Sequence, residues 1–269
     1  MIKKERAKLM CLDDVFLHNL RLKSLLKMYC SSFYEVDHHL KHSLSKNRGF
    51  IEDGYILWIG HIEYLPALMQ SLDNIELVYP LKVLTDLENI TSRLKFLKSN
   101  IINPNIQQHD SDWYLNGYKL QQWTAERQEQ YMASCKGAFD AKSDSFAYAK
   151  KPPTKAQQYI YNRIPFAMDL CSYSAEYFEK RGLVIPNLTQ LTKWHSKEYF
   201  DEISNFVDEN QGTQSIEYVS INYLKYITQT KKTLTPYFLT SYLINSWAQT
   251  ICLAERLLEK TYARFKIYN

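Results

Sequence analysis

Glycine is scarce in this chain, which has only seven among 269 residues. Globular proteins average about 7% glycine, and tight turns and phosphate-cradling loops depend on it. The scarcity therefore argues against Rossmann, propeller and jelly-roll folds. Gly49 and Gly54 have the spacing of a P-loop, but Tyr55-Ile56 stands where Lys followed by Ser or Thr is required. We therefore expect no phosphate-binding loop of that type.

Cysteine is also sparse, and the five cysteines never form a Cys-x-x-Cys pair. An odd number of isolated cysteines indicates neither a disulfide framework nor a cysteine-rich zinc module. This usage favours a reducing, cytoplasmic location.

Long hydrophobic runs that would target or span a membrane are missing. Charged side chains interrupt residues 9–26, so no signal-peptide apolar region is predicted. Residues 233–254 carry no charge, but Pro236, Asn245 and Gln249 make the stretch too polar for a membrane span. We expect a buried helix there and no membrane span.

No sign of charge dominates, since 33 Lys and Arg oppose 29 Asp and Glu, for a net charge of +4. The distribution is nevertheless uneven. Residues 198–217 hold six acidic and no basic side chains, whereas residues 136–155 hold five lysines. The basic stretch interleaves lysines with aromatic rings, a mixture that single-stranded nucleic acid favours. The candidate nucleic-acid-binding residues are Lys142, Tyr148, Lys150, Lys151 and Lys155.

Apolar residues at helical spacing, by contrast, are abundant. They predict long helices over residues 22–44, 77–97, 160–178 and 239–265, and shorter ones over 196–207 and 214–228. Strand signals are few. Asn116-Gly117 permits a type I′ hairpin over residues 113–120, and residues 54–64 fit either a strand or the start of a buried helix.

The predicted fold is therefore mainly α, a two-lobed multi-helix bundle with at most a small β-hairpin near residues 113–120. A polar, proline-containing run marks the domain boundary. We expect an N-terminal helical lobe with the hairpin over residues 1–137, a polar linker over 138–154 and a C-terminal helical lobe over 155–269.

Metal-ligand side chains are most concentrated in residues 35–42. On a helix Glu35, His38 and His42 face one way, the spacing by which helices present metal ligands, and His39 lies beside them. No second Glu-x-x-His exists in the chain, and the three residues lie opposite the apolar stripe of the predicted helix. A solvated helix face is therefore the alternative interpretation.

Two further polar groups allow two interpretations each. His195, Glu198 and Glu202 are spaced by three and four residues, which suits either a metal site or a solvated helix face. The run from His109 to Asp112 could serve acid–base chemistry, but its residues are also ordinary turn formers.

No motif of a common enzyme class is present, and tyrosine, with 21 residues, is plentiful. Tyrosine is enriched in interface cores. The leading hypothesis is a non-enzymatic helical adaptor, a subunit of a larger cytoplasmic assembly with a protein partner, with nucleic-acid contact as a sub-hypothesis. The alternatives are a metal-dependent enzyme that uses Glu35, His38 and His42, and a helical enzyme whose site is scattered over both lobes. No cofactor is predicted.

Overall fold

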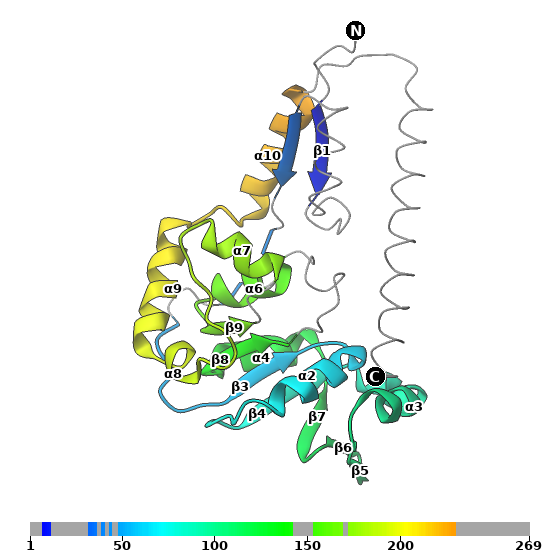
Figure 1. Cartoon of the computed structure of the whole chain (residues 1–269). Coiled ribbons are helices and arrows are strands. Elements are labelled where there is room, and N and C mark those ends of the chain that lie inside the picture. The colour runs from blue at the N-terminus through cyan, green and yellow to red at the C-terminus, as the bar shows by residue number, and fades with distance from the viewer. Residues whose placement is uncertain are drawn as a thin grey trace, which may run out of the picture. The chain divides into compact units, whose positions relative to one another are not determined.

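The computed structural model describes residues 7–11, 32–36, 39–40, 43–44, 48–141, 153–168 and 172–229 (Figure 1). The chain divides into two compact units. Met1–His39 and Gln214–Asn269 form the first, and Leu40–Thr213 form the second.

The first unit contains a pair of parallel strands, β1 (Ala7–Cys11) and β2 (Ser32–Val36). Helix α10 (Ile216–Gln229) contacts both strands and confirms the helix predicted over residues 214–228. The helix predicted over residues 22–44 is wrong where β2 lies, because the aromatic and β-branched residues of that stretch also suit a strand. The helix predicted over residues 239–265 lies outside the described residues.

The second unit is built on a seven-stranded sheet in the order β5-β6-β7-β4-β3-β8-β9. Its strands are β3 (Ile56–Ile59), β4 (Leu81–Thr85), β5 (Ile106–His109), β6 (Asp112–Leu115), β7 (Tyr118–Gln122), β8 (Gly137–Asp140) and β9 (Phe166–Met168). Strands β7, β4, β3, β8 and β9 are parallel, and β5 and β6 extend the β7 edge in antiparallel fashion. The prediction of a mainly α helical bundle is therefore wrong.

The strand order is that of a doubly wound sheet. The chain runs from β3 to β4 and then to β7 in one direction, and returns to place β8 and β9 on the other side of β3. This is the 3-2-1-4-5 order of Rossmann-like folds, with the reversal between β3 and β8. Because parallel crossovers are right-handed, the connections before and after the reversal cover opposite faces of the sheet. Low glycine content did not exclude this architecture.

Helices and 3-10 turns connect the strands, and three more described helices of this unit follow β9 (Figure 1). They are η2 (Ile62–Tyr64), α2 (Leu65–Leu72), η3 (Leu87–Asn89), α3 (Ile90–Asn100), α4 (Ala125–Ser134), α6 (Thr154–Ile160), α7 (Tyr173–Glu179), α8 (Leu191–Trp194) and α9 (Lys197–Glu209). Helix α2 contacts α3, α4 contacts β3, and α6 contacts β8 and β9. Helix α9 confirms the prediction over residues 196–207, and the Ser196 hydroxyl caps it by accepting from Tyr199 N at 3.1 Å.

Two predicted helices contain strands instead. In the stretch 77–97, Leu81–Thr85 is β4, and only residues from Ile90 onward are α-helical. A central parallel strand is covered on both faces, so Val83 and Leu84 of β4 are both buried, and its leucines imitate helical spacing. In the stretch 160–178, α6 ends at Ile160 and β9 follows Pro165.

Both predicted turns are confirmed. Asn116 (φ 49°) and Gly117 (φ 85°) connect β6 and β7 in the left-handed conformation that a type I′ hairpin requires. The run from His109 to Asp112 is the turn between β5 and β6, with Asp110 at φ 53°. The hairpins nevertheless belong to the large sheet rather than standing alone.

The predicted linker over residues 138–154 overlaps β8 at its beginning, and residues 142–152 lie outside the described part of the chain. Strands β8 and β9, which flank this stretch in sequence, pair with each other in the sheet.

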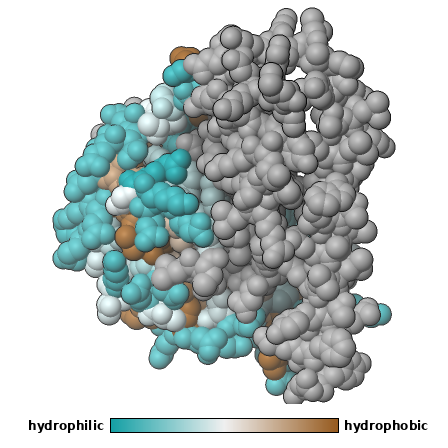
Figure 2. All heavy atoms as spheres, turned by 45° about the horizontal axis from the view of Figure 1, so that its top comes forward, coloured by the Kyte–Doolittle hydropathy of each residue, from teal (hydrophilic) through white to brown (hydrophobic). Residues whose placement is uncertain are grey.

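The core of the second unit lies on both faces of the sheet. Trp58 of β3, Phe139 of β8 and Phe166 of β9 are buried, as are Tyr159 of α6 and Trp194 of α8. The visible described surface is mostly hydrophilic, with hydrophobic residues scattered in small groups (Figure 2). Among the described helices, none combines the length and apolarity needed to cross a membrane.

Candidate functional site

The carboxyl ends of the parallel strands form the first place to seek a site. Open α/β sheets bind ligands outside these ends, near the reversal of strand order. In this sheet the reversal lies between β3 and β8. The side chains at the ends of neighbouring strands are His61 after β3, Asp86 after β4, Trp123 after β7 and Asp140 as the last residue of β8. These four residues define the carboxyl edge.

Gly60 makes the turn at the end of β3. Its N–H donates to the Leu84 carbonyl at 3.1 Å, which joins the turn to β4. A Cβ at this position would lie 2.4 Å from the indole of Trp58. Glycine is therefore required because the backbone passes directly over a buried ring.

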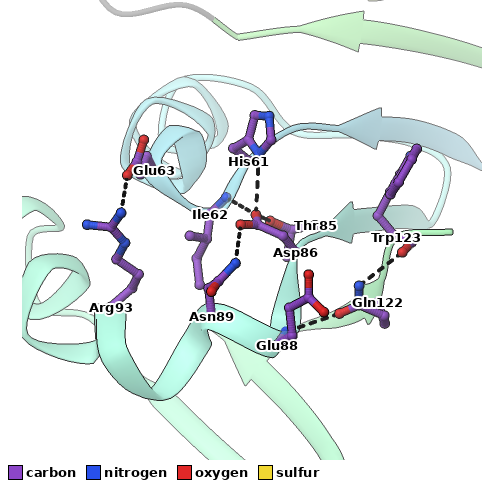
Figure 3. A network of polar contacts seen from close by, with 10 residues as sticks. All are labelled: His61, Ile62, Glu63, Thr85, Asp86, Glu88, Asn89, Arg93, Gln122 and Trp123. Atoms are coloured by element: carbon purple, nitrogen blue, oxygen red, sulfur yellow. Dashed lines mark hydrogen bonds and ion pairs between the residues drawn. The ribbon is translucent and has the colours of Figure 1, made fainter.

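Asp86 organises the loops that follow β3 and β4 (Figure 3). Its Oδ1 accepts a hydrogen bond from Ile62 N at 2.7 Å and lies 3.8 Å from His61 Nδ1. Its Oδ2 accepts from the Asn89 side-chain amide at 3.0 Å. Thr85 Oγ1 also donates to Oδ1, at 3.3 Å. One carboxylate thus holds two loops together.

The charge of Asp86 is stabilised by these contacts. Burial alone would raise the pKa of its carboxyl group, but the hydrogen bonds from Ile62 and Asn89 and the proximity of His61 act in the opposite direction and prevail. The pKa is therefore lower than usual, and Asp86 is ionised at neutral pH.

His61 presents an accessible imidazole beside this carboxylate. Its side chain is 74% exposed, whereas that of Asp86 is only 23% exposed. The ring is 6.1 Å from that of Tyr64, in an edge-on arrangement. A carboxylate near Nδ1 favours the tautomer with hydrogen on Nδ1, which leaves Nε2 as a proton acceptor.

The end of β7 is tied to the same loops. Trp123 N donates to the Thr85 carbonyl at 2.8 Å. The Gln122 side chain accepts from Glu88 N at 3.1 Å and donates to the Trp123 carbonyl at 3.0 Å. In Figure 3 the rings of His61 and Trp123 project in the same direction from the ends of their strands. Polar contacts therefore order the carboxyl edge from β3 to β7.

Asp140 and Lys155 form an ion pair at the end of β8. Lys155 Nζ lies 2.7 Å from Asp140 Oδ1, and the Asp140 side chain is only 6% exposed. The ammonium group also lies 5.6 Å from the centre of the Trp58 ring. The indole Nε1 of Trp58 is buried without a hydrogen-bond partner in the described structure. Asp140 and Trp58 are therefore core residues, and Lys155 provides the counter-ion of the buried carboxylate.

At the amino ends of the parallel strands, which we call the amino edge, a shallow hollow of about 750 Å³ lies before β4. It is lined by residues 72–81 and Tyr118, and no histidine, lysine or arginine is among them. Cys135, before β8, is buried, and burial raises the pKa of its thiol to about 11. The thiol is therefore not a nucleophile at neutral pH. Neither feature places a histidine beside a carboxylate, as the carboxyl edge does.

The predicted nucleic-acid residues are only partly described. Lys155 lies in α6, and its charge is paired with Asp140. Lys142, Tyr148, Lys150 and Lys151 lie outside the described residues, so their role stays a prediction.

The metal site was predicted on a helix, but the structure places Glu35 of that site in a strand. Glu35 lies in strand β2, whereas His38 and His42 lie outside the described residues, and His39 is in a loop. A strand does not present residues three and seven apart on one face as a helix does. Within the described ranges, no group of three metal-ligand side chains comes together. The alternative of a metal-dependent enzyme is therefore not supported.

His195, Glu198 and Glu202 do not share a helix. His195 follows α8, whereas the two glutamates lie in α9. The His195 ring packs 4.1 Å from that of Trp194 and 5.1 Å from that of Tyr79, between centroids. Burial, together with the nearby charge of Lys136, lowers the pKa of His195 to about 4. This histidine is a neutral packing residue at physiological pH.

Sequence reasoning missed His61, Asp86 and Trp123. Each follows a strand. The polar residues His61 and Asp86 come after short runs that contain buried apolar residues, which was the available signal, whereas Trp123 follows two glutamines and has no such signal. The signal was hidden at Asp86, because β4 had been interpreted as part of a helix.

Among known proteins, this chain resembles some solved structures. No protein-family model and no curated protein matches the sequence. One similar structure is WaaG, a glycosyltransferase involved in lipopolysaccharide biosynthesis, with a TM-score of 0.41, 10% identity, and coverage of 74% of this chain and 56% of WaaG. Another is AviGT4, a glycosyltransferase involved in avilamycin A biosynthesis, with a TM-score of 0.37, 12% identity, and coverage of 71% and 55%. The chain spans little more than half the length of either protein.

These findings correct the functional hypothesis. The non-enzymatic adaptor depended on an all-α helical bundle, and the structure instead contains a doubly wound sheet. The adaptor hypothesis and the expectation of no enzymatic activity are therefore wrong in their premise and are not pursued.

Proposed function

We propose that this chain is a group-transfer enzyme that binds a hydroxyl-bearing small molecule at the carboxyl edge and uses His61 to accept the hydroxyl proton. The observation that carries the proposal is the accessible His61 imidazole held beside an ionised Asp86, on the strand where the sheet order reverses. This combination places an acid–base group at the edge where doubly wound folds bind ligands.

The arrangement suits a general base. Asp86 is fixed by Ile62 N and Asn89, so it can orient His61 and stabilise the imidazolium that forms when the proton is taken. Asp86 is therefore a positioning residue, and His61 is the group that meets the substrate. A well-placed general base contributes about 10²- to 10⁴-fold to a reaction rate.

The chemical step follows from these roles. His61 Nε2 takes the hydroxyl proton while the substrate oxygen forms a bond to the electrophilic atom of a donor. The bond between that atom and the leaving group breaks, and its electron pair departs with the leaving group. The proton then passes from the imidazolium to solvent. Glycosyl transfer is one reaction of this class, and it is the first to assay because the two solved structures reported above have that activity.

The test measures release of nucleoside diphosphate from a panel of nucleoside-diphosphate sugars, with water or added sugars as acceptors. His61→Ala should lower kcat by about 10²- to 10⁴-fold, and added imidazole should restore part of the activity. Asp86→Asn should lower kcat less. The new amide oxygen can still accept from Ile62 N, but it carries no charge to stabilise the imidazolium that forms during the reaction.

Two surface variants serve as matched controls. His109→Gln removes an exposed histidine from the β5–β6 turn, and Asp201→Asn removes a carboxylate on α9 that pairs with Lys197 at 2.7 Å. Both should retain wild-type rates. Full activity in His61→Ala, or no turnover of any donor in the panel by the wild-type protein, would refute the proposal.

A further inference from the structure

We infer that Trp123 is the platform on which a ring of the substrate stacks, so that the ligand of the carboxyl edge is a hydroxyl-bearing ring compound, either a sugar or a nucleoside. The inference rests on the proposed function and names the substrate class of the same site. It starts from an exposed aromatic residue at the end of β7, next to the loop that contains Asp86.

Trp123 is placed at the edge by its backbone. Its N–H donates to the Thr85 carbonyl at 2.8 Å, which continues the β4–β7 ladder by one residue. Trp123 is consequently next to Asp86 across the ladder. Its exposed fraction is 41%, although it belongs to an ordered strand end.

The indole is held in one orientation. Nε1 donates to the side-chain oxygen of Gln128 at 2.7 Å, and Gln128 lies in α4. The helix is fixed to the strand end in turn, because Thr124 caps it and Arg127 donates to the Gln122 carbonyl at 2.7 Å. A ligand would therefore meet a preoriented ring, which reduces the entropy cost of binding.

The hydrogen bond also decides what the exposed part of Trp123 can recognise. Because the only polar atom of the indole already has a partner, the remaining exposed surface is ring carbon. Such a surface stacks on a nucleobase or on the apolar face of a pyranose. His61 and Asp86 provide the polar groups for hydroxyls at the same edge, so a ring that carries hydroxyls satisfies both kinds of contact.

Binding is tested by calorimetry and tryptophan fluorescence with uridine, methyl glucoside and uridine diphosphate glucose as separate probes. Trp123→Ala should weaken binding about 5- to 150-fold, as expected for the loss of one stacking contact, whereas Trp123→Phe should retain most of the affinity. Uridine binding would identify a base as the stacked ring, and methyl glucoside binding would identify a sugar.

Two further variants separate stacking from folding effects. Trp113→Phe on β6 is the matched control and should retain the ligand-induced fluorescence change, which Trp123→Phe should lose. Gln128→Ala frees the indole and should raise KM with little change in kcat. Unchanged affinity in Trp123→Ala, with wild-type binding and turnover intact, would overturn this inference alone. Absence of binding by the wild-type protein would overturn the proposed function together with it.

Discussion

Charged side chains that are partly or fully buried in the second unit have polar partners. Asp86 is ionised and holds two loops, and Asp140 neutralises Lys155 in the core. Lys136 is buried with only 4% exposure, and its ammonium group donates to the Ile51 and Glu52 carbonyls. In the described part of the chain, these charged groups therefore have hydrogen bonds to the backbone or an oppositely charged side chain as partner.

His195 provides a prediction at this scale. Its pKa is lowered from 6.5 to about 4 by burial and by Lys136, so the folded protein binds fewer protons than the unfolded chain between these pH values. Stability should therefore fall as the pH drops from 6.5 towards 4. The loss attributable to His195 is about 1 to 2 kcal/mol, allowing for solvent screening of a partly exposed ring.

Urea unfolding at pH 7, 6, 5 and 4 measures this effect. His195→Gln should show a smaller loss of stability over the range than the wild-type protein, whereas His109→Gln should follow the wild type. Identical pH profiles for wild type and His195→Gln would mean that the ring titrates normally in the fold.

Among the elements, β3 does most to position the site. It is the middle one of the five parallel strands, and Gly60 and His61 follow its last residue. Gly60→Ala should destabilise the protein by about 1 to 3 kcal/mol, since the new methyl group would overlap the Trp58 indole at 2.4 Å. Gly49→Ala is a matched control, because nothing lies within 4 Å of a Cβ there. Midpoints of urea unfolding compare the two, and equal stability would show that the Trp58 ring moves aside freely.

The elements also show what the sequence could predict. Helix α9 and the Asn116-Gly117 turn were predictable, because a capped amphipathic helix and a type I′ turn carry local signals. The parallel strands were not. Strands β3, β8 and β9 have only three or four residues, too few to reveal a period of two, and their partners are distant in sequence. Missing β4 also concealed Asp86, so the candidate site could not be assembled.

In the whole molecule, the proposed ligand site depends on the topology of Leu40–Thr213. The parallel strands end at a carboxyl edge and begin at an amino edge. Among the described residues, only the carboxyl edge brings together an accessible histidine, an ionised carboxylate and an exposed tryptophan. The hollow at the amino edge is the competing location for a ligand. The two edges can be distinguished directly.

The most direct measurement is amide hydrogen exchange of the full chain with and without uridine diphosphate glucose at millimolar concentration. We expect slower exchange in residues 60–63, 85–89 and 122–128, the segments that follow β3, β4 and β7. Protection confined to residues 72–81, or no protection at all, would contradict a ligand site at the carboxyl edge.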